Sequence, residues 1–215
     1  MNFSHQHMLP LFIRARLLQM FLALEKTGGT PIDTISLHSF AFFANVLSPL
    51  WDLYPLEGSV LKDGESPYFP ALQKELDRLV GLGLVEVVAL KSGEENQLHA
   101  EFRLRYESAE KALDLIRVLP DEAEVEAFLL ELADAFVEIR PELRDDAARL
   151  DAAYSDPGVA EGRVVDFAEW VSPTRGNASW NTAQKFQQYV EEGVTLNRAE
   201  KLVMYMRLMQ RRANG

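Results

Sequence analysis

The sequence of 215 residues contains no cysteine. Disulfide bonds, thiolate zinc sites and cysteine nucleophiles are therefore excluded, and the composition fits a reducing compartment. No apolar run approaches the roughly 20 residues that a membrane-spanning helix needs, so no membrane partner is expected. The best N-terminal candidate, residues 8–24, carries Arg14 and Arg16 in its middle and lacks a small-residue cleavage site. We therefore expect an amphipathic helix rather than a signal peptide, and a cytoplasmic protein.

Basic side chains are scarce as well. The chain has 22 Lys and Arg against 33 Asp and Glu, a net charge of −11. Residues 120–160 hold 3 basic and 12 acidic side chains, whereas residues 161–215 hold 8 basic and 6 acidic ones. Lys and Arg supply most non-specific DNA affinity by neutralising phosphates, so this chain is expected to bind DNA poorly unless it forms a local basic patch.

Motifs of common catalytic sites are also missing. The sequence has no phosphate-binding glycine loop followed by lysine, no G-x-S-x-G nucleophile elbow and no H-E-x-x-H zinc motif. The carboxylates between Asp121 and Glu138 have no accompanying histidine and fit no ordered ligand spacing, so we interpret them as a solvated face or an acidic docking surface. The sequence thus predicts a protein that is not an enzyme, with no catalytic residue, cofactor, metal ligand or small-molecule substrate.

The best organised stretch is residues 66–90, "SPYFPALQKELDRLVGLGLVEVVAL". Ser66 is a candidate helix cap, and the prolines suit the first turn of a helix, where a missing N–H costs little. Apolar residues at helical spacing predict a buried stripe of Leu72, Leu76, Leu79 and Val80. Glu75 lies near the margin of that stripe. Glycines end the helix, and the strand-like segments 84–91 and 97–106 are expected to form a β-hairpin.

The same periodicity predicts helices before and after this stretch. Two precede it, over residues 10–26 and, after a cap at Asp33 or Thr34, over residues 35–47. Those in the second half are expected over residues 121–139, 141–154, 181–193 and 196–212. The expected fold class is therefore mainly α: a winged-helix-like domain with a small β-hairpin over residues 1–106, followed by a helical extension. Since no Gly/Ser linker separates them, residues 107–215 are expected to dock on the first domain.

Seven polar residues are candidates for contact with a partner or with DNA: Gln73, Lys74, Arg78, Arg103, Arg105, Arg207 and Arg211. The first three are expected on the exposed face of the helix within residues 66–90. Glu75 and Asp77 offset the two cations of that helix, so DNA reading is not the default interpretation.

The other four candidates lie on the wing and on the last helix. Arg103 and Arg105 share one face of a strand, where they could follow a phosphate backbone or guard an exposed strand edge. Arg207 and Arg211 belong to the basic side of the C-terminal helix, where the helix dipole by itself favours cations.

Three segments of residues 37–87 carry a family resemblance: "FANVLSPLWDLYPL", "LKDGESPYFPALQKELDRL" and "GLGLVEV". With them, this region resembles the N-terminal part of the middle-component proteins of ABC-type three-component systems. These are bacterial operons that include Lamassu-like anti-phage defence. The resemblance covers about a quarter of the chain and contains no catalytic signature.

The resemblance implies a small non-catalytic subunit encoded between an effector and an SMC/Rad50-like ATPase. Our leading hypothesis is an accessory or scaffold subunit that bridges the ATPase and a nuclease-type effector, with DNA met through the assembled complex. The alternative is a winged-helix transcriptional regulator that reads duplex DNA through Gln73, Lys74 and Arg78, with its wing on phosphates. A third hypothesis is a hydrolase or nuclease that uses the central carboxylates.

Overall fold

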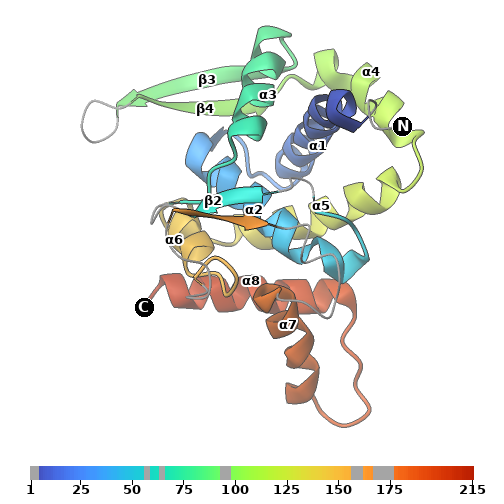
Figure 1. Cartoon of the computed structure of the whole chain (residues 1–215), viewed down its shortest axis with the longest axis vertical. Helices are drawn as coiled ribbons and strands as arrows, with labels where there is room; N and C mark the ends of the chain where they lie inside the picture. The colour runs from blue at the N-terminus through green and yellow to red at the C-terminus, as the bar shows by residue number, and fades with distance from the viewer. Residues whose placement is uncertain (1–4, 56–58, 63–65, 93–97, 156–161, 167–176) are drawn as a thin grey trace.

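A computed structural model of the chain describes residues 5–55, 59–62, 66–92, 98–155, 162–166 and 177–215. The predicted mainly helical fold is confirmed: in these residues α-helices predominate and a small antiparallel sheet lies at one end (Figure 1). None of the helices in the described part combines the length and the apolar character that crossing a bilayer requires. Parts of the stretch that carries the family resemblance, and the turn between the two hairpin strands, lie outside the described residues.

In its described residues, the first half of the chain contains three α-helices and a three-stranded sheet. Its elements are α1 (His5–Lys26), β1 (Ile32–Asp33), α2 (Thr34–Leu47), α3 (Pro70–Gly81), β3 (Val85–Ser92) and β4 (Leu98–Leu104). The antiparallel strands are ordered β1-β4-β3, with Ile32 opposite Phe102 and Val85 opposite Leu104. The hairpin of β3 and β4 projects from the body of the molecule (Figure 1). Sequence periodicity does not predict β1, because a two-residue strand is too short to show a period.

The N-terminal ends of α2 and α3 differ in how well the sequence predicts them. Helix α2 begins as expected, with Asp33 accepting a hydrogen bond from the Ser36 N–H at 2.9 Å. The predicted cap at Ser66 is wrong: α3 begins at Pro70, and its N-cap residue is Phe69 with φ −115° and ψ 98°. A residue before proline is held extended, so the helix starts only at the proline itself.

The second half contains five helices in the described residues. They are α4 (Tyr106–Arg117), α5 (Glu122–Val137), α6 (Arg144–Arg149), α7 (Ala178–Lys185) and α8 (Arg198–Ala213). Helix α4 has no counterpart among the predicted helices; it buries only Ala109, Leu113 and Ile116. The expected helices over 141–154 and 181–193 are shorter than predicted. A 3-10 turn, η3 (Pro141–Leu143), precedes α6, and another, η5 (Phe186–Tyr189), follows α7.

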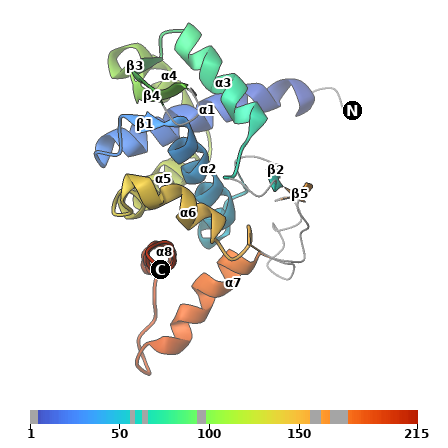
Figure 2. The same cartoon turned by 90° about the vertical axis from the view of Figure 1, so that its left-hand side faces the viewer.

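One hydrophobic core joins the two halves. Phe136 of α5 meets Phe40 and Phe43 of α2 edge to face, with ring centroids 5.2 and 6.3 Å apart. A second sheet pairs β2 (Ser59–Lys62) of the first half with β5 (Arg163–Asp166) of the second. Helix α8 lies across the lower side of the body, and α7 leads away from it (Figures 1 and 2). The second half is therefore packed on the first, while a domain boundary at residue 106 stays a prediction.

Candidate interaction surfaces

The candidate residues of α3 differ in how free they are. Gln73 donates a hydrogen bond from its amide to Asp77 at 2.9 Å, and its carbonyl oxygen lies 3.3 Å from His38 Nε2. Arg78 donates from Nη1 to Glu75 at 2.5 Å. Lys74 is exposed and forms no ion pair with any described residue. Of the three, Lys74 is therefore the side chain fully open to a partner.

Glu75 is buried rather than marginal, with 2% of its surface exposed. Arg14 of α1 donates to Glu75 Oε2 from Nε at 3.0 Å and from Nη2 at 2.7 Å, and Arg78 binds the other carboxylate oxygen. The position of Glu75, one turn after Leu72 and one turn before Leu79, places it on the buried side of α3. Glu75 therefore offsets Arg78 as expected, but as a buried partner that it shares with Arg14, and it forms no ion pair with Lys74.

His38 of α2 forms a hydrogen bond with the backbone at the start of α3. Its Nδ1 accepts a hydrogen bond from the backbone N–H of Phe69 at 3.1 Å, so the ring proton is on Nε2, which faces Gln73. Burial disfavours the charged imidazolium and lowers the pKa of His38 to about 4, although the hydrogen bond with Gln73 acts in the opposite direction. His38 is therefore neutral at pH 7 and has a structural role.

The two arginines of the wing lie close to an acidic residue on the neighbouring strand. Arg103 on β4 stands opposite Glu86 on β3, and Arg105 Nε lies 3.6 Å from a Glu86 carboxylate oxygen. Both arginines are exposed, and Arg103 forms no ion pair with a described residue. The wing is therefore partly neutralised, with Arg103 the freer of its two cations.

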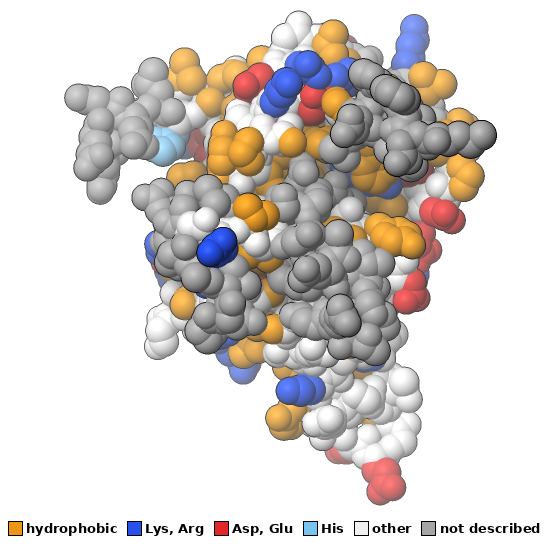
Figure 3. All heavy atoms as spheres, in the orientation of Figure 1, with side chains coloured by type: hydrophobic (Ala, Val, Ile, Leu, Met, Phe, Trp, Pro, Cys, Tyr) orange, Lys and Arg blue, Asp and Glu red, His pale blue; other side chains and the backbone are white. Residues whose placement is uncertain are grey.

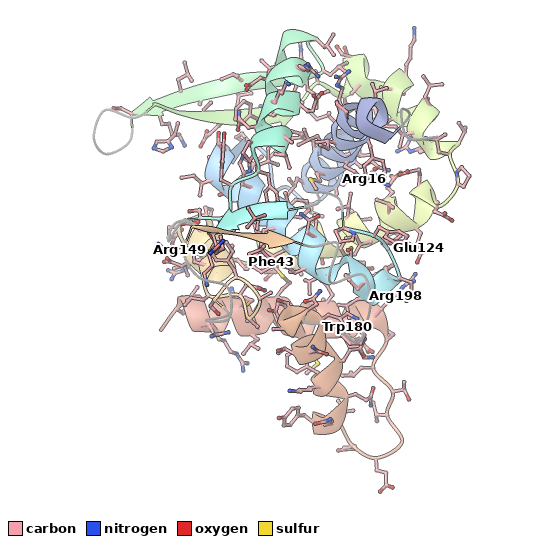
Figure 4. The ribbon with its side chains drawn as sticks, viewed as in Figure 1. Arg16, Phe43, Glu124, Arg149, Trp180 and Arg198 are labelled. Atoms are coloured by element: carbon pink, nitrogen blue, oxygen red, sulfur yellow. The ribbon has the colours of Figure 1, made fainter. Side chains whose placement is uncertain are left out.

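A hollow of about 490 Å³ lies between α1, the 3-10 turn η1 (Ser48–Trp51) and the start of α5. Its walls include the side chains of Phe12, Arg16, Trp51, Asp52, Tyr54, Pro120, Glu122 and Glu124. Arg16 is buried and binds Glu122 and Gln19. On the outer side, Arg198 of α8 lies over the Trp51 ring, 5.1 Å from its centroid, and pairs with Glu124 (Figure 4).

The carboxylates of α5 therefore belong to two groups. Those of its first turns bind cations of three other helices: Glu122 with Arg16, Glu124 with Arg198, and Glu126 with Lys26 and Arg117. Arg117 and Lys26 hold the pKa of Glu126 below its usual value. The interpretation of this helix as a solvated acidic face is wrong for these residues and holds for Glu131, Asp134 and Glu138, which are exposed. Within the described residues, no three His, Cys, Asp or Glu side chains are grouped so that they could hold a metal ion.

A buried polar cluster centred on Asp151 is not predicted by any motif. Asp151 is fully buried and accepts hydrogen bonds from the Tyr205 hydroxyl at 2.5 Å, the Ser179 hydroxyl at 2.7 Å and the Ala153 N–H at 2.8 Å. Burial raises the pKa values of Asp151 and Tyr205. These hydrogen bonds connect the segment that follows α6 to Ser179 of α7 and to Tyr205 of α8. Its only sequence signal is a single aspartate among apolar residues in "ARLDAAY".

Arg207 and Arg211 lie one turn apart on the outer side of α8. Both are exposed, and neither forms an ion pair with a described residue. Together with Phe186, Met204 and Leu208 they line a hollow of about 240 Å³. Of the seven candidates, these two are brought together without an ion pair to a described residue, and Arg207 also lines a hollow of about 230 Å³ with Asp134 and Glu138 of α5.

No protein-family model, no curated protein and no solved structure matches the chain. The family resemblance of residues 37–87 consequently depends on the three sequence segments alone.

Proposed function

We propose that the chain is a non-catalytic accessory subunit of an SMC/Rad50-like ATPase complex of anti-phage defence, bridging the ATPase and a nuclease-type effector. The observation that carries the protein-binding role is an exposed apolar surface at the turn from α4 to α5. Leu115, Val118 and Leu119 are 71%, 78% and 54% exposed. Leu115 lies in the last turn of α4, Val118 is its C-cap residue and Leu119 follows, so the three are close in the chain, and clustered exposed apolar side chains mark protein contacts.

This α4–α5 apolar surface continues onto the start of α1. Phe12 is 40% exposed and lines the same hollow as Pro120, the residue that follows Leu119. On the face seen in Figure 3, hydrophobic side chains reach the surface along the edge formed by α4 and α5, with acidic side chains beside them. An apolar centre with a charged rim is the usual composition of a protein–protein interface. The association with an ATPase and an effector comes from the family resemblance.

A winged-helix assignment of residues 5–104 is part of the same proposal. It is supported by the order α1, β1, α2, α3, β3, β4 and by the sheet order β1-β4-β3, which place a hairpin directly after the third helix. In DNA-binding proteins of the helix-turn-helix class, the polar side of such a helix reads bases. Here Gln73 and Arg78 bond to neighbours within the chain, which favours a scaffold role for this domain.

The test is co-expression with the proteins of the neighbouring genes, which the proposal expects to be an ATPase and an effector, followed by affinity capture and size-exclusion chromatography. The three proteins are expected to elute together. Because Val118 is exposed, Val118→Asp should leave the fold intact but reduce capture of the neighbours about tenfold or more. Leu90→Asp, at a position of the hairpin that is 67% exposed, is the matched control and should have no effect. A folded chain that elutes alone in the presence of both neighbours contradicts the proposal.

A DNA-binding regulator is the second candidate, favoured by the exposed and unpaired cations Lys74 on α3 and Arg103 on the wing. Gel shifts across a salt series decide between the two, since affinity that depends on phosphate contacts falls as salt rises. A regulator would bind duplex DNA as an isolated chain and lose binding on Lys74→Glu. A scaffold is expected to bind DNA only within the complex, where charge reversal at Arg103 and Arg105 weakens DNA binding without disrupting assembly.

A further inference from the structure

Helices α7 and α8 meet at a wide angle on the lower side of the molecule, and the chain between them projects away from the body (Figures 1 and 2). The projecting segment carries two exposed apolar side chains, Tyr189 at 80% and Val194 at 49%. Between η5, which follows α7, and α8 lies the hollow of about 240 Å³ that Arg207 and Arg211 line. We call it the α7–α8 groove, defined by Phe186, Met204, Arg207, Leu208 and Arg211.

The groove has an apolar floor and a basic rim. Phe186 comes from η5, and Met204 and Leu208 lie one turn apart on α8; all three are half-buried. Arg207 and Arg211 follow α8 with the same four-residue spacing, so both guanidinium groups lie along one side of the apolar strip. A helix with apolar residues at positions i and i+4 and charged residues beside them matches this geometry.

No carboxylate of the described residues lines the groove, although Arg207 also lines a second hollow with Asp134 and Glu138 of α5. Elsewhere in the molecule, arginines lie against carboxylates: Arg14 and Arg78 against Glu75, and Arg198 against Glu124. Neither Arg207 nor Arg211 has such a partner among the described residues, although the whole chain carries a net charge of −11. An acidic ligand is repelled by most of this surface, so electrostatics would direct it to the groove.

We propose that the α7–α8 groove binds an acidic amphipathic helix of a partner protein. Apolar side chains of that helix pack on Phe186, Met204 and Leu208, and its Glu or Asp side chains pair with Arg207 and Arg211, as carboxylates do with the planar guanidinium group. The apolar floor favours this occupant over nucleic acid, whose backbone would use the arginines but leave the floor exposed. The inference rests on the proposed function only in taking the partner to be a protein.

The experiment uses the full chain and a dye-labelled synthetic helical peptide with Leu at i, i+4 spacing and Glu beside it, followed by fluorescence anisotropy. Two control peptides replace Leu by Ser or Glu by Lys, and a labelled DNA duplex is a third control. The Glu/Leu peptide is expected to bind and the controls to bind at least about tenfold more weakly, since both apolar packing and charge pairing are needed.

The matched protein variants are Arg211→Glu and Arg212→Glu. Both residues are exposed neighbours on α8, but only Arg211 lines the groove, so far-UV circular dichroism should show the fold unchanged in both. Arg211→Glu is expected to weaken peptide binding about tenfold or more, and Arg212→Glu less than about twofold. Equal effects of the two substitutions would contradict the proposal that the peptide binds in the groove. Absence of binding by the Glu/Leu peptide would contradict it as well. Equal binding of the Lys/Leu peptide, or a preference for the duplex, overturns the acidic-helix chemistry.

The outcome is separable from the proposed function. Peptide binding that depends on Arg211, in a chain that captures neither neighbour, supports the groove and refutes the complex. A complex that assembles normally with Arg211→Glu, from a chain that binds no Glu/Leu peptide, refutes the groove and leaves the complex standing.

Discussion

Helices α3 and α8 both have a polar side that the sequence marks for contact with a partner, yet the molecule uses the two sides differently. On α3, Glu75 is buried between two arginines, and Gln73 faces His38. On α8, Arg207 and Arg211 are exposed without an ion pair to a described residue. The number of charged residues on a helix therefore does not show how many of them are available to a partner. A charge that already pairs with a neighbour inside the fold contributes little to binding.

The two sides of α8 have different roles: one side packs inside the fold and the other is exposed to a partner. Its inner side carries Tyr205, which donates to the buried Asp151, and its outer side carries the two arginines of the groove. In α3 the two roles share the same residues, since Arg78 is partly exposed and also binds Glu75. Substitutions of Glu75 and Arg78 on α3 should therefore affect stability, and those on the outer side of α8 should affect binding alone.

The largest predicted effect is a loss of stability at low pH. It arises at the α2–α3 junction, where His38 of α2 bonds to the start of α3. The pKa of His38 is about 4 in the folded chain and 6.5 unfolded, so the unfolded state takes up the proton first. The stability contributed by neutral His38 is complete above pH 6.5 and is lost as pH falls toward 4, by about 3 kcal/mol at roughly 1.4 kcal/mol per pKa unit. Urea unfolding across this range should show the decline, and His38→Gln should remove most of it.

The control for this experiment is His99→Gln, on the hairpin. The side chain of His99 is half-buried and makes no hydrogen bond to α3. This variant should keep the decline between pH 6.5 and 4 that the unsubstituted chain shows. A decline that persists unchanged in His38→Gln would show that the junction does not depend on the neutral imidazole.

The next effect concerns the buried carboxylate of α3. Glu75→Gln leaves Arg14 and Arg78 without their counter-charge and should lower the free energy of unfolding by about 2–3 kcal/mol. The figure is below that for fully buried pairs because the two arginine side chains are 23% and 46% exposed. Urea denaturation followed by circular dichroism measures it. Asp77→Asn, an exposed position on the same helix, should change stability by less than about 0.5 kcal/mol, and equal losses for both variants would contradict the buried ion pairs.

The smallest predicted effects are those of substitutions on the two sides of α8, with Tyr189 of η5 as a control. Tyr205→Phe removes a donor from the buried Asp151 and should lower the free energy of unfolding by about 1–2 kcal/mol. Tyr189→Phe, at an exposed tyrosine, and Arg207→Gln should each change it by less than about 0.5 kcal/mol. Thermal and urea unfolding of the three variants measure the difference. A loss for Arg207→Gln comparable to that for Tyr205→Phe would show that the outer side of α8 is also structural.

Local signals predict much of the first half and little of the pairing within it. The cap at Asp33, the apolar stripe of α3 and the positive φ of 71° at Gly83 follow from residues close in sequence. Strand β1 and the pairing of β2 with β5 do not, since each depends on a partner far along the chain. Six of the seven candidate residues were assigned to the correct elements. Arg105, expected in the strand, follows the end of β4 and is the N-cap residue of α4. The ion pairs of the candidates could not be read from spacing.

By itself the sequence determined the two hairpin strands and the helices other than α4, because apolar periodicity and prolines act over a few residues. It also determined that α8 is rich in cations, whereas residues 120–160 hold 3 basic and 12 acidic side chains. Only the tertiary structure decided which charges remain available. Glu75 and Arg14 are 61 residues apart in the chain and meet only when α1 packs on α3, whereas Arg207 and Arg211 form no ion pair with a described residue. The physical reason is that burial and ion pairing depend on neighbours in space, which local sequence patterns do not encode.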